Sequence, residues 1–221
     1  MAWAQPTEAA VEQESPMSGH MQAILAHFGP LSAGPLSTGM AGHILLMNLL
    51  APVVAVWAAR SSPSLVRSFR SLAAPTLAQL LLLWGWHAPP SLAAAMDRPA
   101  LHLAMQGSLL LAALWFWSAV VNATAGGQWR AIAALLATSK LFCLLGVLLT
   151  FASYPLYPAM AHHGLQAPDP LADQQLAGLL MLVACPLSYL VAAVVVASNW
   201  LLSSDQPVRR PEGASEGVTV A

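Results

Sequence analysis

The sequence predicts an all-α fold: a polytopic membrane helical bundle of about five spans, with six as the upper count. Of the 221 residues, 57% are hydrophobic and only 8% are charged, and the mean hydropathy is +0.64. Soluble domains carry about 25% charged residues, and a globule of this size cannot hide so much apolar surface from water. The composition therefore excludes an ordinary soluble enzyme.

The charged residues and the cysteines exclude two further classes of protein. Eight Lys and Arg against nine Asp and Glu leave no basic field for phosphates, so no nucleic-acid partner is expected. Two cysteines in a chain of this length are too few for a disulfide framework or a zinc cluster.

Five stretches are long and apolar enough to cross a bilayer. A span needs about 20 mostly apolar residues, because backbone polar groups in lipid must be satisfied within the helix. Residues 20–36 are too short and too interrupted by Gly and Pro to span, so we expect an interfacial or re-entrant segment there. The predicted spans are 40–59, 72–88, 100–121, 131–152 and 176–202.

These spans divide the chain into three regions. Residues 1–35 form a polar N-terminal tail with the short interfacial segment, and they lack the basic and apolar regions of a signal peptide. Residues 36–202 form the transmembrane helical domain. Residues 203–221 are polar and contain Pro, Gly and Glu, so we expect a disordered cytoplasmic tail.

The cations predict the orientation in the membrane, because cytoplasmic loops carry an excess of Lys and Arg. Six cations fall on one predicted side, Arg98 falls on the other, and Lys140 is left within a span. This distribution places the N-terminus outside and the C-terminus inside a multi-pass membrane protein. The six cations on the inner side are Arg60, Arg67, Arg70, Arg130, Arg209 and Arg210.

All seven histidines fall at or beyond the predicted outer face. Such a one-sided imidazole cluster in a charge-poor membrane protein indicates metal or haem chemistry at that face. Three of them, His43, His87 and His102, lie near the outer ends of the first three spans. Because the loop 89–99 is short, we expect His87 and His102 to lie close together on antiparallel neighbours. The other histidines are His20, His27, His162 and His163.

Methionines accompany the histidines of the spans. Met40, His43 and Met47 have i, i+3, i+7 spacing, which places them on one helix face. Met105 follows His102 by three residues in the third span. Thioether and imidazole together are a soft ligand set that selects Cu(I) over harder ions, although each methionine is alternatively a packing residue. The candidate copper ligands are His43, His87, His102, Met40, Met47 and Met105.

Several other residues allow two interpretations. Cys143 and Cys185 lie at similar predicted depths and are either a dithiolate pair or two small buried hydrophobes. Lys140 is expected to face the bundle interior, to snorkel to the inner interface or to contact a partner. Asp173 precedes the apolar run of the fifth span and is expected to cap that helix. Gly178 is expected to allow close helix approach.

A series of short motifs follows the spans in order: Met40-Ala41-Gly42-His43 with Met47 and Ala51-Pro52, Trp86-His87-Ala88-Pro89, the His102 motif, Phe116-Trp117, Leu156-Tyr157-Pro158 and Asp173-Gln174-Gln175-Leu176-Ala177-Gly178. Together they resemble the multi-span CtaG family of cytochrome c oxidase assembly proteins over roughly residues 36–202. The single-span copper chaperone that shares this name uses a Cys-x-Cys pair, which the present sequence lacks.

The resemblance implies a role in the maturation of haem-copper oxidases, through delivery or insertion of copper at the binuclear centre of the oxidase. The chain departs from the family pattern at two positions. Gly39 stands where the family usually has the first His of His-Met-x-x-His, and Gln106 stands where it usually has the second His of His-x-x-x-His. Methionines, or His20 and His27, are the candidate substitutes for these imidazoles.

The resulting hypothesis is a non-enzymatic inner-membrane assembly factor that holds Cu(I) at its periplasmic face and passes it to a haem-copper oxidase subunit. No His-Glu-x-x-His motif or acid–base pair indicates an enzyme. One alternative is a haem-binding membrane redox protein with two outer histidines as axial ligands. Another is a metal-free assembly scaffold that recognises oxidase helices. The expected partners are the oxidase subunit and the lipid bilayer, and the loading of the site by a periplasmic copper chaperone is left open.

Overall fold

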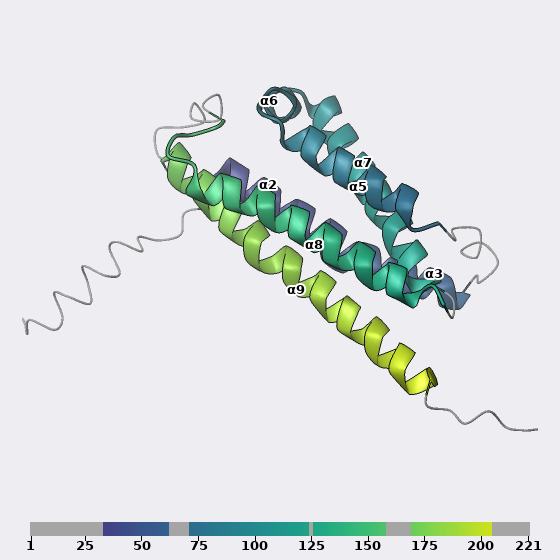
Figure 1. Ribbon diagram of the computed structural model, residues 1–221. Helices are drawn as coiled ribbons and strands as arrows, with labels where there is room; N and C mark the ends of the chain where they lie inside the picture. Colours follow the sequence, from purple (N-terminus) through teal and green to yellow (C-terminus); the bar gives the residue numbers. More distant parts are fainter. Residues whose placement is uncertain (1–32, 62–70, 124–125, 158–168, 205–221) are drawn as a thin grey trace, which may run out of the picture.

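Long helices make up most of the computed structural model of the protein, which describes residues 33–61, 71–123, 126–157 and 169–204 (Figure 1). Within these ranges there is no β-strand, and the predicted all-α bundle is confirmed. His20, His27, His162, His163 and most of the two predicted tails lie outside the described residues.

Four helical stretches of the described chain are long and apolar enough to cross a membrane, and they correspond to the first, third, fourth and fifth predicted spans. The second predicted span, 72–88, is the helix α5 (Ala73–His87), whose 15 residues are fewer than the roughly 20 that a full crossing needs. The four long stretches are Pro35–Ser61, Pro99–Val121 (α7), Gln128–Phe151 (α8) and Pro170–Ser203, which belongs to α9 (Pro170–Ser204).

The first span contains a change of helix type. It runs from α2 (Pro35–Ile44) through a π-helical turn, η1 (Leu45–Leu50), into α3 (Ala51–Ser61). Pro35 occupies the first turn, where its missing N–H is not needed, so the Gly34-Pro35 pair begins this helix rather than interrupting it. Pro52 has no N–H with which to bond the carbonyl four residues earlier. The wider π-helical turn ends at Leu50, just before this proline.

The expected loop 89–99 is instead mostly a helix, α6 (Pro89–Asp97). Ala88 is extended, with ψ of 135°, and it ends α5. The two prolines do stop the preceding helix, as predicted. Because the fixed φ of proline suits the first helical positions, they also begin the next helix, which separates His87 from α7.

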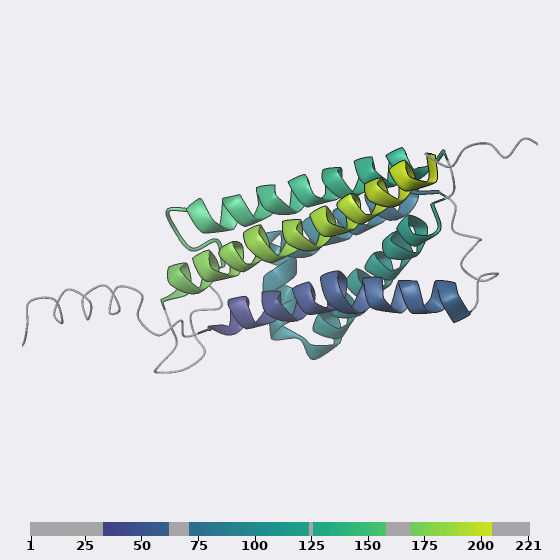
Figure 2. The same ribbon diagram turned by 90° about the horizontal axis from the view of Figure 1, so that it is seen from below.

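The helices of the bundle pack against one another along their lengths. Figure 2 shows α8 and α9 side by side along their lengths, and α2 packs on α9 while α3 and α5 pack on α7. A Cβ added at Gly178 of α9 would lie 2.7 Å from the Thr150 nitrogen and 2.8 Å from the Gly146 carbonyl oxygen of α8. The predicted packing role of Gly178 is therefore confirmed.

Aromatic side chains fill the middle of the bundle. Tyr189 lies with its ring centroid 5.1 to 5.7 Å from those of Phe116, Trp117 and Phe142, and its hydroxyl accepts a hydrogen bond from Gln79 Nε2. Many leucines and valines of the same helices are exposed on the outside of the bundle. An apolar exterior around a packed core is the arrangement that a lipid environment requires.

Candidate metal site

At the end of the bundle where α2 and α9 begin, a carboxylate joins these two helices, which are distant in the sequence. Asp173 Oδ1 accepts hydrogen bonds from the Gly34 nitrogen (3.0 Å) and the Ser37 nitrogen (3.1 Å), and Oδ2 accepts one from the Leu36 nitrogen (2.9 Å). These donors belong to the start of α2, where the first backbone N–H groups have no partner within the helix. A Cβ at Gly34 would collide with this carboxylate, so glycine permits the close approach.

The expectation that Asp173 caps its own helix is therefore wrong. A capping side chain must come from the residue that precedes the first turn, whereas Asp173 is the fourth residue of α9. Asp169 lies before that helix, with Oδ1 at 3.5 Å from the Leu171 nitrogen. Asp173 instead fixes the part of α2 that leads into Met40 and His43.

Tyr157 and Gln174, from two of the motifs, fix the neighbouring ends. The Tyr157 hydroxyl donates to the His87 carbonyl oxygen at 2.7 Å, and burial raises the pKa of this phenol to about 12. Gln174 Oε1 accepts from the Leu156 nitrogen at 2.6 Å, and its Nε2 donates to the Leu149 carbonyl oxygen at 3.2 Å. These hydrogen bonds hold the ends of α5, α8 and α9 close to one another.

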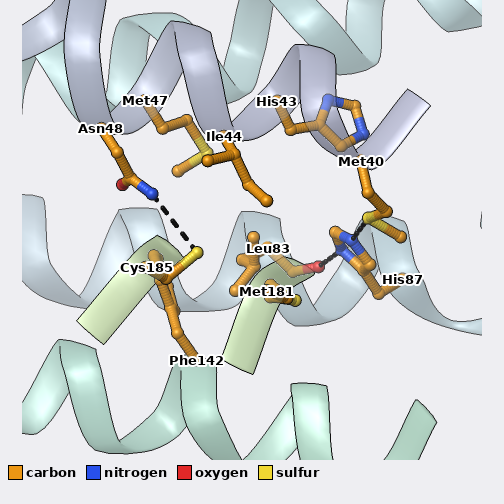
Figure 3. A pocket seen from close by; sticks show the side chains of 10 residues that line it. All are labelled: Met40, His43, Ile44, Met47, Asn48, Leu83, His87, Phe142, Met181 and Cys185. Carbon is orange, nitrogen blue, oxygen red and sulfur yellow. Dashed lines mark hydrogen bonds between the residues drawn. The ribbon is translucent and has the colours of Figure 1, made fainter. Parts of the chain in front are cut away.

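A small cavity lies among α2, η1, α5, α8 and α9 (Figure 3). Its volume is about 10 Å³, which is room for roughly one water-sized species. Six of its ten lining residues carry an imidazole or a sulfur atom. The lining residues are Met40, His43, Ile44, Met47, Asn48, Leu83, His87, Phe142, Met181 and Cys185.

The two histidines of this cavity lie side by side with defined tautomers. The ring centroids of His43 and His87 are 5.9 Å apart, and the residues are 5% and 4% exposed. His43 Nδ1 is 2.8 Å from Gln106 Oε1, and His87 Nδ1 is 2.7 Å from the Leu83 carbonyl oxygen. Carbonyl oxygens only accept, so each Nδ1 carries the proton and each Nε2 keeps its lone pair, as in metal-binding histidines.

One contact in the cavity joins two lone-pair donors. His87 Nε2 lies 3.2 Å from Met40 Sδ, and the thioether has no proton to give. Since the proton of the neutral imidazole is on Nδ1, no hydrogen bond links these atoms. Two soft Lewis bases that face each other in a small cavity are suited to bind a soft cation in common.

His102 and Met105 line an adjoining cavity, also of about 10 Å³, together with Met40 and His43. His102 Nε2 lies 3.4 Å from Gln106 Nε2, and Gln106 in turn bonds His43. The structure thus places all six predicted ligand residues around two adjoining cavities. Within the part of the chain that the structure describes, no three His, Cys, Asp or Glu side chains form a metal-holding group, so any such site needs the thioethers.

Met181 was not among the predicted ligands, and Cys185 was considered only as half of a dithiolate pair with Cys143, although both Met181 and Cys185 line the cavity. A signal for them existed, because Asp173, Ala177, Met181 and Cys185 recur at every fourth position of α9 and all are buried. Cys143 is free and half-buried and is not among the lining residues of this cavity.

Two other features lie away from this site: the Lys140 side chain, and a larger cavity towards the opposite end of the bundle. The Lys140 side chain is exposed on α8, so the expectation that it faces the bundle interior is wrong, and the snorkelling and partner-contact interpretations both stand. A larger cavity of about 920 Å³ lies between α5 and the start of α8, beside Arg130 and Trp129. Its described lining contains no His, Cys or Met.

A family model described as cytochrome c oxidase caa3 assembly factor (Caa3_CtaG) matches residues 2–203. The chain belongs to the Caa3_CtaG family. The match covers more than the transmembrane domain over which the motifs pointed to this family, and it confirms the resemblance. Neither the curated proteins nor the solved structures yield a match to the chain.

Residues from several of these motifs meet at one end of the bundle. His43, His87, Tyr157 and Asp173 come from motifs that are far apart in the sequence, yet hydrogen bonds and ring contacts link them at that end. The family is one of cytochrome c oxidase assembly factors, and the apolar helices indicate a membrane protein.

Proposed function

We propose that this Caa3_CtaG-family protein is a non-enzymatic assembly factor of the inner membrane that binds Cu(I) at the periplasmic end of its bundle and passes it to a haem-copper oxidase subunit. Oxidase assembly is the role of the family. Copper handling, which the resemblance implies, is the part that we propose for this chain, and one observation supports it most directly. His87 Nε2 and Met40 Sδ lie 3.2 Å apart, and in the neutral tautomer with the proton on Nδ1 both atoms offer lone pairs.

The ligands of this site would be neutral and soft. Met40 and Met47 would supply thioethers, and His43 and His87 would supply Nε2 lone pairs, a set that favours Cu(I) over harder divalent ions. Gln106 and the Leu83 carbonyl would hold the two rings in the ligating tautomer. A site without a carboxylate or thiolate binds weakly enough to release its ion, as transfer requires.

His102 is suited to the hand-over step. Unlike His43 and His87 it is only half-buried, and the cavity that it lines also includes Met40 and His43. An ion that leaves the buried pair would therefore meet His102 before a partner protein. In this proposal the three predicted histidines have different tasks: His43 and His87 retain the ion, and His102 transfers it.

Copper binding to purified protein tests the proposal. Wild type and a His43→Ala/His87→Ala/His102→Ala variant would be titrated anaerobically with Cu(I) against a chromogenic chelator. We expect the triple variant to lose at least tenfold in affinity for Cu(I) while it keeps the helical circular dichroism of wild type. Equal copper retention by the two proteins would remove this site from consideration.

The two alternatives make different predictions. A haem needs space for a macrocycle between its axial ligands, whereas the cavity beside His43 and His87 has a volume of only about 10 Å³; a Soret band in purified protein would nevertheless establish haem binding. A metal-free scaffold predicts normal oxidase maturation by the triple variant in a deletion strain. Impaired maturation, rescued by added copper, is the outcome that our proposal predicts.

A further inference from the structure

The side-chain amide of Gln106 connects two of the three predicted histidines. Its Oε1 lies 2.8 Å from His43 Nδ1, and its Nε2 lies 3.4 Å from His102 Nε2. The two histidines line adjoining cavities, whereas Gln106 is among the lining residues of neither. Gln106 therefore contacts both rings without lining the space in which an ion would lie.

No other contact decides which end of this amide faces which ring. Among the described residues, the two imidazoles are the only hydrogen-bond partners of the Gln106 side chain. An imidazole nitrogen can either donate or accept, so each ring suits either end of the amide. Gln174 is a contrast, because its Oε1 accepts from the Leu156 nitrogen and its Nε2 donates to the Leu149 carbonyl oxygen, and backbone groups cannot exchange these roles.

The two orientations of the Gln106 amide place the imidazole protons differently. With Oε1 towards His43, the His43 proton is on Nδ1 and its Nε2 keeps a free lone pair. His102 Nε2 then accepts from the amide nitrogen, so the His102 proton is on Nδ1 and this ring has no free lone pair. With the amide turned end for end, both protons are on Nε2, and only His102, through Nδ1, can bind an ion.

We propose that Gln106 is a positioning residue that selects, by the orientation of its amide, whether His43 or His102 offers a lone pair to the copper ion. This inference rests on the proposed function, because it explains how the ion held beside the buried histidines passes to His102. The two rings are ligands in turn and never together, so the ion moves from one to the other and is not held between both.

Two other ligands of the proposed site do not depend on this amide. His87 Nδ1 donates to the Leu83 carbonyl oxygen at 2.7 Å, and because a carbonyl oxygen only accepts, His87 Nε2 keeps its lone pair in both states. Met40 lines both cavities, and Figure 3 shows its side chain reaching towards His87. Met40 is therefore placed to stay bound while the ion exchanges His43 for His102.

The exchange conserves protons, charge and oxidation state. The bond from copper to His43 Nε2 breaks, and a bond to His102 Nδ1 forms. Each ring keeps one proton, which moves from Nδ1 to Nε2 by way of water, and each cavity has room for about one water-sized species. The ion remains Cu(I), so no electron donor or acceptor takes part.

Nitrogen NMR of the copper-free full chain in lipid bilayers tests this role, because protonated and unprotonated imidazole nitrogens resonate at different shifts. The histidines would be labelled with nitrogen-15 at one fixed neutral pH, and His43→Ala and His102→Ala would assign the signals. We expect both rings to populate both tautomers in one shared ratio, and Gln106→Met, which removes both hydrogen bonds, to shift the ratio of at least one ring. Unequal ratios in wild type, one fixed tautomer for both rings, or ratios that Gln106→Met leaves unchanged would overturn the proposal.

Cu(I) binding by the full chain measures the consequence for the ion. Gln106→Glu presents two acceptor oxygens, so His43 keeps its proton on Nδ1, His102 keeps its proton on Nε2, and both rings offer a lone pair at once. We expect this variant to bind one Cu(I) about tenfold more tightly than wild type and to release it more slowly to a chelator, and Gln106→Met to bind about tenfold more weakly. The matched controls Gln128→Glu and Gln128→Met, at the first residue of α8, should behave as wild type.

The outcomes separate this inference from the proposed function. Equal affinity and equal release rate in Gln106→Glu and Gln128→Glu would overturn the alternation of the two rings and leave the copper site in place. If wild type binds no Cu(I), the proposed function fails, and the NMR measurement on copper-free protein still decides whether Gln106 couples His43 to His102.

Discussion

The carboxylate of Asp173 is predicted to be a main link between α9 and α2, and its removal gives the sharpest test of the fold. Asp173→Ala would leave three backbone N–H groups, those of Gly34, Leu36 and Ser37, without their acceptor. An ordinary N-cap contributes about 1 kcal/mol, and a hydrogen bond to a charged group contributes about 1.5–3 kcal/mol. Water can reach this end of the bundle once the side chain is gone, so we expect a loss of about 3 kcal/mol rather than the full sum.

The assay is unfolding in mild detergent by added denaturing detergent, followed by circular dichroism, with Asp169→Ala as the matched control. Asp169 is exposed, and among the described residues its side chain contacts only the Leu171 nitrogen, at 3.5 Å, so its loss should cost less than about 1 kcal/mol. Asp173→Asn should fall between the two, because it keeps one acceptor and loses the charge. If Asp173→Ala is no less stable than Asp169→Ala, the cap on α2 does not carry the energy assigned to it.

Three other substitutions test separate parts of the structure. Gly178→Ala should destabilise the protein by roughly 1–3 kcal/mol, because α8 leaves no room for a Cβ. The control Gly107→Ala should be neutral, because a Cβ there meets nothing within 4 Å. Equal unfolding midpoints for the two variants would contradict the close contact. Tyr157→Phe should cost about 1–3 kcal/mol at neutral pH by leaving the His87 carbonyl unpaired, while Tyr154→Phe serves as the exposed control. Because the pKa of Tyr157 is raised to about 12, its stabilisation is complete below pH 10 and is lost as the pH rises towards 12, so a difference between wild type and Tyr157→Phe that persists unchanged above that range would refute this role. Lys140→Leu should not lower the unfolding midpoint, since this side chain is exposed; loss of oxidase co-purification at unchanged stability would favour the partner contact over snorkelling.

The fold was largely predictable because membrane spans depend on a local property. Apolar stretches of sufficient length must be helical in lipid, and each predicted span overlaps a helix whose ends differ by a few residues. The short helix α6 was missed because Pro89 and Pro90 indicate equally the end of one helix and the start of another. The π-helical turn depends on backbone register around Pro52, which the apolar pattern does not record.

The site was predictable in its residue types but not in its connections. One-sided histidines with methionines at helical spacing pointed to the cavity that Met40, His43 and His87 now line. The target of Asp173 lies more than 130 residues away in the sequence, and no local rule can identify such a partner. Met181 was missed because methionines are common in apolar spans, and only packing distinguishes the one that faces the imidazoles.

The central claim is that the imidazole nitrogens and sulfur atoms of this cavity hold copper together. X-ray absorption at the copper edge of the Cu(I)-loaded, full-length protein measures this directly, because nitrogen and sulfur neighbours scatter differently. We predict a first shell that contains both nitrogen and sulfur, and a shift to sulfur alone in the His43→Ala/His87→Ala variant. A shell of nitrogen and oxygen without sulfur would contradict the claim.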